Sequence, residues 1–239
     1  MIPCISLWNW KDAAGIAGNI FAFGLFLSPL PTFRRIIRNH STEQFSGLPY
    51  IYSLFNCLIC MWYAAPLVST DNLMVMTVNS FGALFHLLYA ILFTVYADKR
   101  IQIRMFGLLL AAFALLALLL VGSLQITSTD ARRMFVGFFS CVSLISMFAS
   151  PLFIINLVIR MESVEFMPFY LSLSTFLMST SFMIYGILNA DAFIYVPNGI
   201  GCILGITQLV LYCHYERKST EESLIENINE TERQGNDLS

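Results

Sequence analysis

The chain alternates between long apolar runs and short polar segments that hold nearly all of its charges. No run contains Asp, Glu, Lys or Arg beyond its first one or two residues. A helix that crosses a bilayer needs about 20 mostly apolar residues, and each run has roughly that length. We therefore predict seven membrane-spanning helices near residues 14–33, 49–68, 72–96, 105–124, 134–158, 168–188 and 194–215.

The cations of the connecting segments fall unequally on the two sides that seven spans define. The poorer side has Lys11, Arg132 and Arg133. Because cytoplasmic loops carry an excess of Lys and Arg, we expect the side with more cations to be cytosolic. The C-terminal tail lies on that side. The acidic tail, residues 216–239, is expected to be disordered. The richer side holds Arg34, Arg35, Arg38, Lys99, Arg100, Arg104, Arg160, Arg217, Lys218 and Arg233.

Composition narrows the class of protein further. Hydrophobic residues make up 57% of the 239 positions and charged residues 12%, whereas ordinary soluble domains have about 45–50% and 25%. This excludes a soluble enzyme, and a net charge of −2 without a basic stripe excludes a nucleic-acid binder. Most of the six cysteines lie in apolar runs and are typical of packed side chains. The chain contains no motif for catalysis or for a phosphate-bearing cofactor, so none is expected.

An internal duplication is the most informative feature of the sequence. Residues 26–30 recur at 148–152, and Arg38-x-x-Ser41-x-Glu43 recurs as Arg160-x-x-Ser163-x-Glu165, both at an offset of 122. After a three-residue contraction the offset is 119. The residues paired at this second offset include Pro49 and Pro168, Ser53 and Ser172, Asn79 and Asn198, and Gly82 and Gly201.

Each repeat contains three spans, and an odd number of spans would invert the second repeat relative to the first. The run 105–124 has no partner in the duplication and restores the parallel orientation. We therefore predict an all-α membrane protein of two parallel three-helix bundles and one linker helix. The expected parts are residues 1–104, the linker 105–124, residues 125–215 and the tail 216–239. A substrate site is expected at the interface of such repeats.

Several motifs resemble the SWEET family of plant sugar transporters over roughly residues 14–215. They are Phe-Gly-Leu-Phe-Leu-Ser-Pro (23–29), Ser-Thr-Glu-Gln-Phe-Ser-Gly-Leu-Pro-Tyr (41–50), Asn56-Cys57 with Trp62-Tyr63, Ser-Val-Glu-Phe-Met-Pro (163–168) and Val-Pro-Asn-Gly-Ile-Gly (196–201). The resemblance implies facilitated, bidirectional passage of mono- or disaccharides, and it is nearest to members that handle glucose-like hexoses. It leaves open the plasma membrane or the vacuolar membrane, and a monomer or a homo-oligomer.

Two repeat-related amides, Asn79 and Asn198, lie within apolar runs. An unpaired amide in hydrocarbon is costly, so each must face protein, water or substrate. Pseudo-symmetry brings both toward the central axis, where donor–acceptor groups suit sugar hydroxyls. The alternative is an ordinary interhelical hydrogen bond. The resemblance implies substrate binding by both residues.

Four prolines occupy corresponding points of the two repeats: Pro29, Pro49, Pro151 and Pro168. Pro49 and Pro168 could simply begin helices, but Pro29 and Pro151 lie too deep in their runs for that. The resemblance implies that all four form hinges that control the cytosolic side.

Further site residues follow only from the resemblance. Cys60 and Phe182 match pocket positions, although Phe182 falls where other members often have Trp, which makes the choice of sugar less certain. Tyr63 and Asp191 correspond to a gate on the extracellular or luminal side, closed by a phenol–carboxylate hydrogen bond. Asp191 could equally be a solvated loop residue.

His86 is the only ionisable residue well inside a predicted span. Its repeat counterpart is Gly205, and we expect a neutral imidazole hydrogen-bonded between helices. No carboxylate lies near a span centre, which favours a uniporter. The main alternative, a proton-coupled carrier of the PQ-loop type, predicts Pro-Gln dipeptides and a membrane acid, and the sequence has neither. A seven-helix receptor predicts no duplication.

Overall fold

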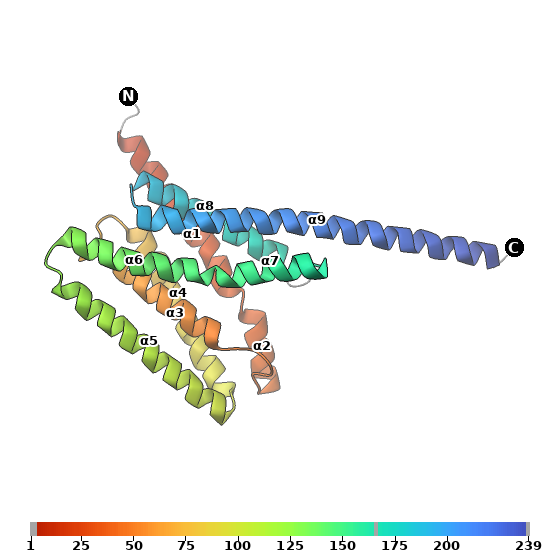
Figure 1. Cartoon of the computed structure of the whole chain (residues 1–239), viewed down its shortest axis with the longest axis horizontal. Coiled ribbons are helices and arrows are strands. Elements are labelled where there is room, and N and C mark those ends of the chain that lie inside the picture. The colour runs from red at the N-terminus through yellow and green to blue at the C-terminus, as the bar shows by residue number, and fades with distance from the viewer. Residues whose placement is uncertain (1–3, 165–166, 238–239) are drawn as a thin grey trace.

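The computed structural model describes residues 4–164 and 167–237, and the side chains of 10–164 and 167–218. Glu165, the expected counterpart of Glu43, lies outside these residues. All regular secondary structure in the described residues is helical, and these residues contain no strand (Figure 1). Its helices are α1 (Cys4–Leu27), α2 (Leu30–Asn39), α3 (Leu48–Tyr63), α4 (Leu73–Tyr96), α5 (Lys99–Gln125), α6 (Thr129–Met147), α7 (Ala149–Met161), α8 (Phe169–Leu188) and α9 (Ala192–Asp237).

Within the described residues, six helical stretches are long and apolar enough to cross a membrane. Two of them, Trp10–Asn39 and Thr129–Met161, each join two helices, and α3 is a shorter apolar helix of 16 residues. The run expected at 49–68 therefore extends too far, because α3 ends at Tyr63. Pro66 explains the difference, since proline disfavours helix in the residue before it and cannot continue the hydrogen-bond ladder.

Two predicted spans, 14–33 and 134–158, are each broken into two helices. α1 ends at Leu27 and α2 begins at Leu30, with Pro29 at its N-cap. α6 ends at Met147 and α7 begins at Ala149, so Pro151 lies in the first turn of α7. Proline lacks the amide hydrogen that an interior helix position needs. Pro29 and Pro151 thus begin helices as well, contrary to expectation, but these helices start inside a span.

The remaining two prolines begin helices at loops. Pro49 is the second residue of α3 and Pro168 is the N-cap of α8. This is the simpler of the two interpretations of these residues.

The duplication is visible in the packing of the helices. α3 packs on α4 as α8 packs on α9, and α1 packs on α8 as α3 packs on α6. Left-handed backbone conformations also recur at repeat-related positions. His40 and Glu162 have φ values of 48° and 50°, and Asp71 and Ala190 have values of 62° and 49°.

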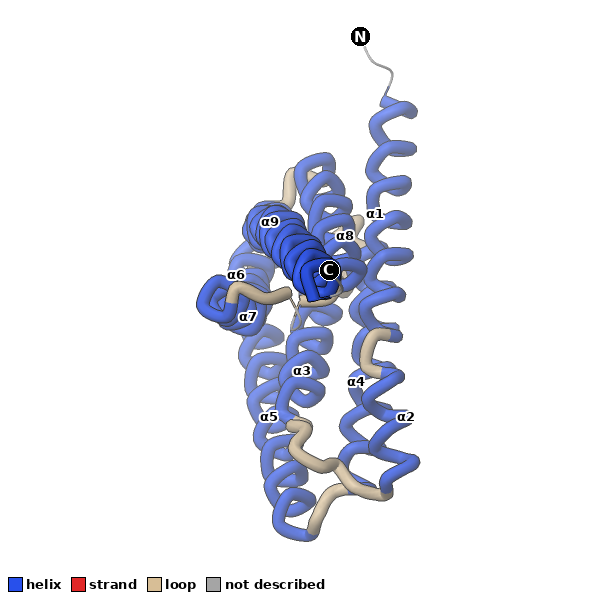
Figure 2. Tube along the Cα trace, turned by 90° about the vertical axis from the view of Figure 1, so that its right-hand side faces the viewer, coloured by secondary structure: helices blue, strands red, loops and turns tan. Residues whose placement is uncertain are grey.

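The helices form two groups, the first bundle (α1–α4) and the second bundle (α6–α9). Figure 1 shows that the groups meet near the start of α6 and diverge toward α2 and α7. We call the end where they meet, with residues 64–72 and 189–191, the gate end. Figure 2 shows the structure from the side toward which the C-terminal end of α9 points, so that α9 is seen almost end-on. In this view α1, α3, α4 and α5 run in roughly the same direction, across that of α9.

The linker helix α5 packs mainly on α3 and only slightly on α6. Three residues, 126–128, join it to α6 at the gate end. Arg132 fixes this connection, since its guanidinium donates to the carbonyls of Ser123 and Ile126 and, at 2.9 Å, to the carbonyl of Leu67.

The tail does not match the expectation of disorder. α9 continues beyond residue 216 to Asp237. The segment contains no proline, and its Glu, Arg, Leu and Gln residues have high helix propensity, which physically accounts for the extension.

Candidate functional site

A cavity of about 290 Å³ lies between the two bundles. Small-ligand pockets have volumes of roughly 300–1,000 Å³, so this volume is near the lower end of that range. All four residues expected to bind substrate line it: Asn79, Asn198, Cys60 and Phe182. Residues from the first and the second bundle thus form one site.

The two amides are arranged alike. The side chain of Asn79 donates to the carbonyl of Val75 at 2.8 Å, and that of Asn198 donates to the carbonyl of Ile194 at 2.8 Å. Each bond reaches back one helical turn and uses one of the two amide hydrogens. Since an amide has two donors and an acceptor oxygen, each side chain keeps a donor and an acceptor for a molecule in the cavity.

Cys60 and Phe182 form part of the cavity wall. The Cys60 sulfur lies 3.2 Å from the Ser140 hydroxyl across the α3–α6 contact, and the residue is buried. The Phe182 ring covers Gly18 of α1 so closely that a Cβ atom there would lie 2.7 Å from the ring. A glycine at this position of α1 therefore makes room for the aromatic ring.

The residues expected at the gate are in direct contact. The hydroxyl of Tyr63 lies 2.7 Å from both carboxylate oxygens of Asp191. The two side chains come from α3 of the first bundle and from the start of α9 in the second. Their residues are only 1% and 0% exposed. The contact lies at the gate end, where Tyr63 also lines the cavity.

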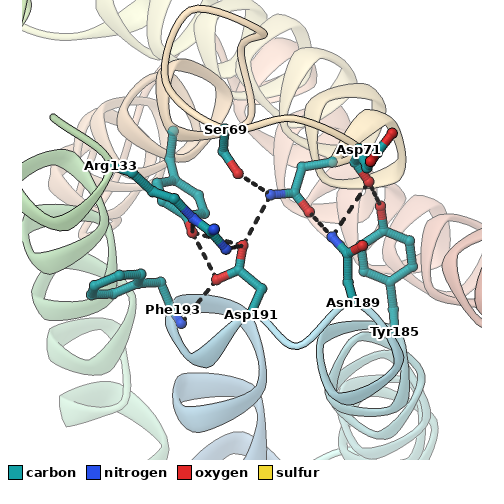
Figure 3. Close-up of polar contacts among 9 residues, drawn as sticks. Ser69, Asp71, Arg133, Tyr185, Asn189, Asp191 and Phe193 are labelled. Carbon is teal, nitrogen blue, oxygen red and sulfur yellow. Dashed lines mark hydrogen bonds and ion pairs between the residues drawn. The ribbon is translucent and has the colours of Figure 1, made fainter. Parts of the chain in front are cut away.

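Other polar side chains at the gate end were not identified from the sequence (Figure 3). The guanidinium of Arg133 lies 2.9 Å from the Asp191 carboxylate, and Asn72 donates to the same carboxylate at 3.0 Å. Asn189 donates to the Asn72 oxygen at 2.7 Å. The repeat offset of 119 could have found one of these, because it pairs Asn72 with Asp191.

Local helix chemistry positions this pair. α4 begins directly after Asn72 and α9 directly after Asp191. The Asp191 carboxylate accepts a hydrogen bond of 3.1 Å from the backbone N–H of Phe193, which is a side-chain N-cap. The same carboxylate thus starts α9 and binds across to the first bundle.

The proline breaks lie away from the gate end, where the bundles diverge. At the first break, the Tyr89 hydroxyl of α4 donates to the carbonyl of Phe26 at 2.7 Å. Proline breaks free carbonyls from the helix ladder, and this hydroxyl satisfies one of them. Tyr52 of α3 links the bundles on one side, since its hydroxyl contacts Ser146 and lies 3.3 Å from the Ser143 carbonyl.

His86 differs from the expectation. It lines the cavity, but no described residue forms a hydrogen bond with its ring, and its Nδ1 atom is buried without a partner. The reason lies in its surroundings, because the rings of Phe26 and Tyr89 face it and the Tyr89 hydroxyl is bound to a carbonyl.

Charged residues are absent from the described cavity lining, which has no Asp, Glu, Lys or Arg. Within the described residues, no group of three or more His, Cys, Asp or Glu side chains could hold a metal ion. The cavity therefore offers neutral donors and acceptors on an apolar wall, an arrangement that suits an uncharged polyhydroxylated molecule.

Comparison with known proteins identifies the family. A family model described as "Sugar efflux transporter for intercellular exchange" matches twice, at residues 12–101 and 134–220, once in each repeat. Bidirectional sugar transporter SWEET2 of Arabidopsis thaliana is 67% identical over 217 residues, covering 91% of this chain and 92% of the relative. Bidirectional sugar transporter SWEET2a of Sorghum bicolor is 60% identical over 210 residues, covering 88% and 86%.

A solved structure agrees with both matches. The 3.7 Å resolution structure of a eukaryotic SWEET transporter superposes with a TM-score of 0.85 at 55% sequence identity, covering 87% of this chain and 97% of that one. Sequence, fold and duplication thus lead to one assignment: the chain belongs to the SWEET family of membrane transporters.

Proposed function

We propose that this protein is a passive, bidirectional transporter of sugars, with glucose-like monosaccharides as its main substrates and disaccharides as candidates. The observation that carries the proposal is the cavity between the bundles, in which Asn79 and Asn198 present matching amides. The described lining of this cavity has no charged side chain. Relatives named as bidirectional sugar transporters support the choice of substrate class.

Sugar binds between the bundles, and rocking of one bundle against the other alternates access to the cavity. The Tyr63–Asp191 contact is the gate at one end, and the four prolines are the hinges at the other. A neutral site gives weak binding, about millimolar or only ~4 kcal/mol, which permits fast release.

The loop charges support the orientation that we propose. The N-terminus and the gate end face the outside or a lumen, and the C-terminus faces the cytosol of a plasma or vacuolar membrane. If the protein lies in the plasma membrane, an epitope tag after Ser239 should be protected from antibody in intact cells. If it lies in the vacuolar membrane, the tag should be accessible on isolated intact vacuoles. Labelling of intact cells, or protection of the tag on intact vacuoles, would contradict this orientation. The bundle boundaries and any assembly into a homo-oligomer stay predictions.

Uptake of radiolabelled glucose into liposomes tests the function. We expect saturable uptake that does not change with a pH gradient. The Asn79→Ala, Asn198→Ala double variant should bind about 30-fold more weakly, since two hydrogen bonds of about 1 kcal/mol are lost. Asn156→Ala is the matched control, because Asn156 is exposed on α7 outside the cavity lining.

The results separate the proposal from its alternatives. Uptake of neither glucose, fructose nor sucrose by well-folded protein would overturn it. Uptake that follows the proton gradient would instead favour the coupled carrier, for which His86, an ionisable residue of the cavity lining, is the candidate proton acceptor.

A further inference from the structure

The cavity wall contributed by α4 carries a second polar group besides its amide. Asn79 and His86 are seven residues apart, which is close to two helical turns, so both face the cavity. At 1.5 Å per residue the two positions are separated by about 10.5 Å along the helix. His86 therefore lies farther from the gate end than the amide pair.

The His86 ring has hydrogen-bonding capacity that no described residue uses. Its Nδ1 atom is buried without a partner. Its aromatic neighbours, Phe26 at 5.9 Å and Tyr89 at 6.5 Å between ring centroids, contact it through their rings and not through hydrogen bonds. The Tyr89 hydroxyl is bound to the Phe26 carbonyl. Buried polar atoms without partners are rare and need an explanation.

Neutral imidazole suits a sugar hydroxyl chemically. One ring nitrogen donates and the other accepts, and a hydroxyl can do both. The lengths of two hydrogen bonds, about 2.8 Å each, and the width of one pyranose ring add up to a distance similar to the rise along α4 between Asn79 and His86. A single monosaccharide can therefore reach from the amide to the imidazole.

The second bundle has no counterpart of His86. Gly205 occupies the repeat-related position, and a Cβ atom there would lie 2.9 Å from the Cβ and 3.0 Å from the Cα of Phe176. Close packing of α9 on α8 thus excludes a side chain at this position. The two amides are matched, whereas the imidazole is present on one wall alone.

We propose that His86 is a substrate-contacting residue that hydrogen-bonds one sugar hydroxyl and thereby sets the orientation of the sugar between the two matched amides. This inference rests on the proposed sugar transport and assigns a further specificity-determining residue to the same cavity. It makes recognition asymmetric, as an asymmetric ring requires.

A series of mono-deoxyglucoses, each lacking one hydroxyl, tests the contact. We expect His86→Leu to raise the KM for glucose about three- to tenfold, and His86→Gln, which keeps a donor and an acceptor, to stay within about twofold. The unmodified protein should transport one of these deoxyglucoses less well than glucose. The His86→Leu variant should transport that deoxyglucose and glucose equally well. A merely structural role would weaken all of these sugars alike, and that result overturns the inference.

A second measurement needs no change at His86. His40 and His214 are exposed, and His40→Asn with His214→Gln leaves one imidazole; Asn tolerates the left-handed backbone at position 40. The nitrogen-15 NMR resonances of that imidazole should shift on addition of glucose and stay unchanged on addition of buffer alone. No shift at glucose concentrations that saturate uptake overturns the inference. The absence of uptake by the unmodified protein would instead overturn the proposed function.

Discussion

Asn72 and Asp191 occupy the same position in the two repeats, and the Asn72 amide donates to the Asp191 carboxylate at 3.0 Å. Each residue directly precedes the last transmembrane helix of its bundle. Two carboxylates at this distance would repel each other, whereas an amide and a carboxylate attract. The duplicated position has therefore become different in the two halves, and this difference allows it to join the bundles.

The first prediction concerns this closed end. Asp191→Ala removes the carboxylate that accepts hydrogen bonds from Tyr63 and Asn72 and pairs with Arg133. The gate end should open more often, and Cys60 in the cavity should react faster with a bulky, membrane-impermeant maleimide added from that side. We expect at least a tenfold rise in rate, equivalent to about 1.4 kcal/mol, in protein with Cys60 as its single cysteine.

Asp71→Asn is the control for this experiment, since the described contacts at Asp71 use its backbone carbonyl. An unchanged alkylation rate in Asp191→Ala would show that the carboxylate does not hold the gate closed.

The second prediction uses two glycines of α1. A Cβ atom at Gly18 would meet the Phe182 ring at 2.7 Å, whereas one at Gly24 would have nothing within 4 Å. Gly18→Ala should displace the ring, destabilise the protein by about 1–3 kcal/mol and slow glucose uptake. Gly24→Ala should leave uptake unchanged and should not destabilise the protein, since alanine has a higher helix propensity than glycine. Thermal unfolding and uptake measure the effects, and equal behaviour of the two variants would contradict the close packing.

The third prediction concerns the break between α1 and α2. Tyr89→Phe removes the hydroxyl that satisfies the Phe26 carbonyl and should cost about 1 kcal/mol of stability. Because the break is a proposed hinge, the rate of uptake should change as well. Tyr50→Phe is the matched control, since Tyr50 packs by its ring against Phe33 and Tyr89. Tyr89→Phe with the stability and uptake of Tyr50→Phe would contradict the role of the hydroxyl.

The fourth prediction concerns pH and residues 40–47, the loop between α2 and α3. Hydrogen bonds from Arg35 and Asn39 lower the pKa of the Glu43 carboxyl below its ordinary value. A lowered pKa in the folded state means that the stabilisation is present above the ordinary value, about 4.3, and is lost as pH falls through the lowered one. The protection of the loop amides against hydrogen exchange, relative to their intrinsic rates at each pH, should therefore fall in acid.

Glu43→Gln is the comparison for that experiment. It should show the weaker protection of this loop at neutral pH and little further change in acid. Equal protection of the two proteins at neutral pH would show that the carboxylate does not order the loop.

Much of the fold could be predicted because its causes are local or repeated. Apolar runs show which segments cross a membrane, and the offsets of 122 and 119 show that the halves correspond. The same offsets, together with a family resemblance, placed Asn79 and Asn198 in one cavity. By contrast, the breaks at Leu27 and Met147 leave the hydrophobicity unchanged, so the apolar pattern did not reveal them.

The remaining parts of the site depend on contacts between distant segments. Arg133 belongs by sequence to a charged loop, and only the packing of α6 on α9 brings it to Asp191. The surroundings of His86 likewise follow from the position of the Phe26 and Tyr89 rings, since the Tyr89 hydroxyl is bound to a backbone carbonyl. Sequence alone shows such residues as polar but does not show their partners.

The three-residue connection between α5 and α6 sets an upper limit on how far the gate end can separate beside it. Four chain steps lead from Gln125 to Thr129, and at no more than about 3.6 Å each they span roughly 14 Å when fully extended. Because α5 stays on α3, this tether also restrains α3 and α6. On the α3–α6 side, the opening of the gate end is therefore limited by the length of this connection.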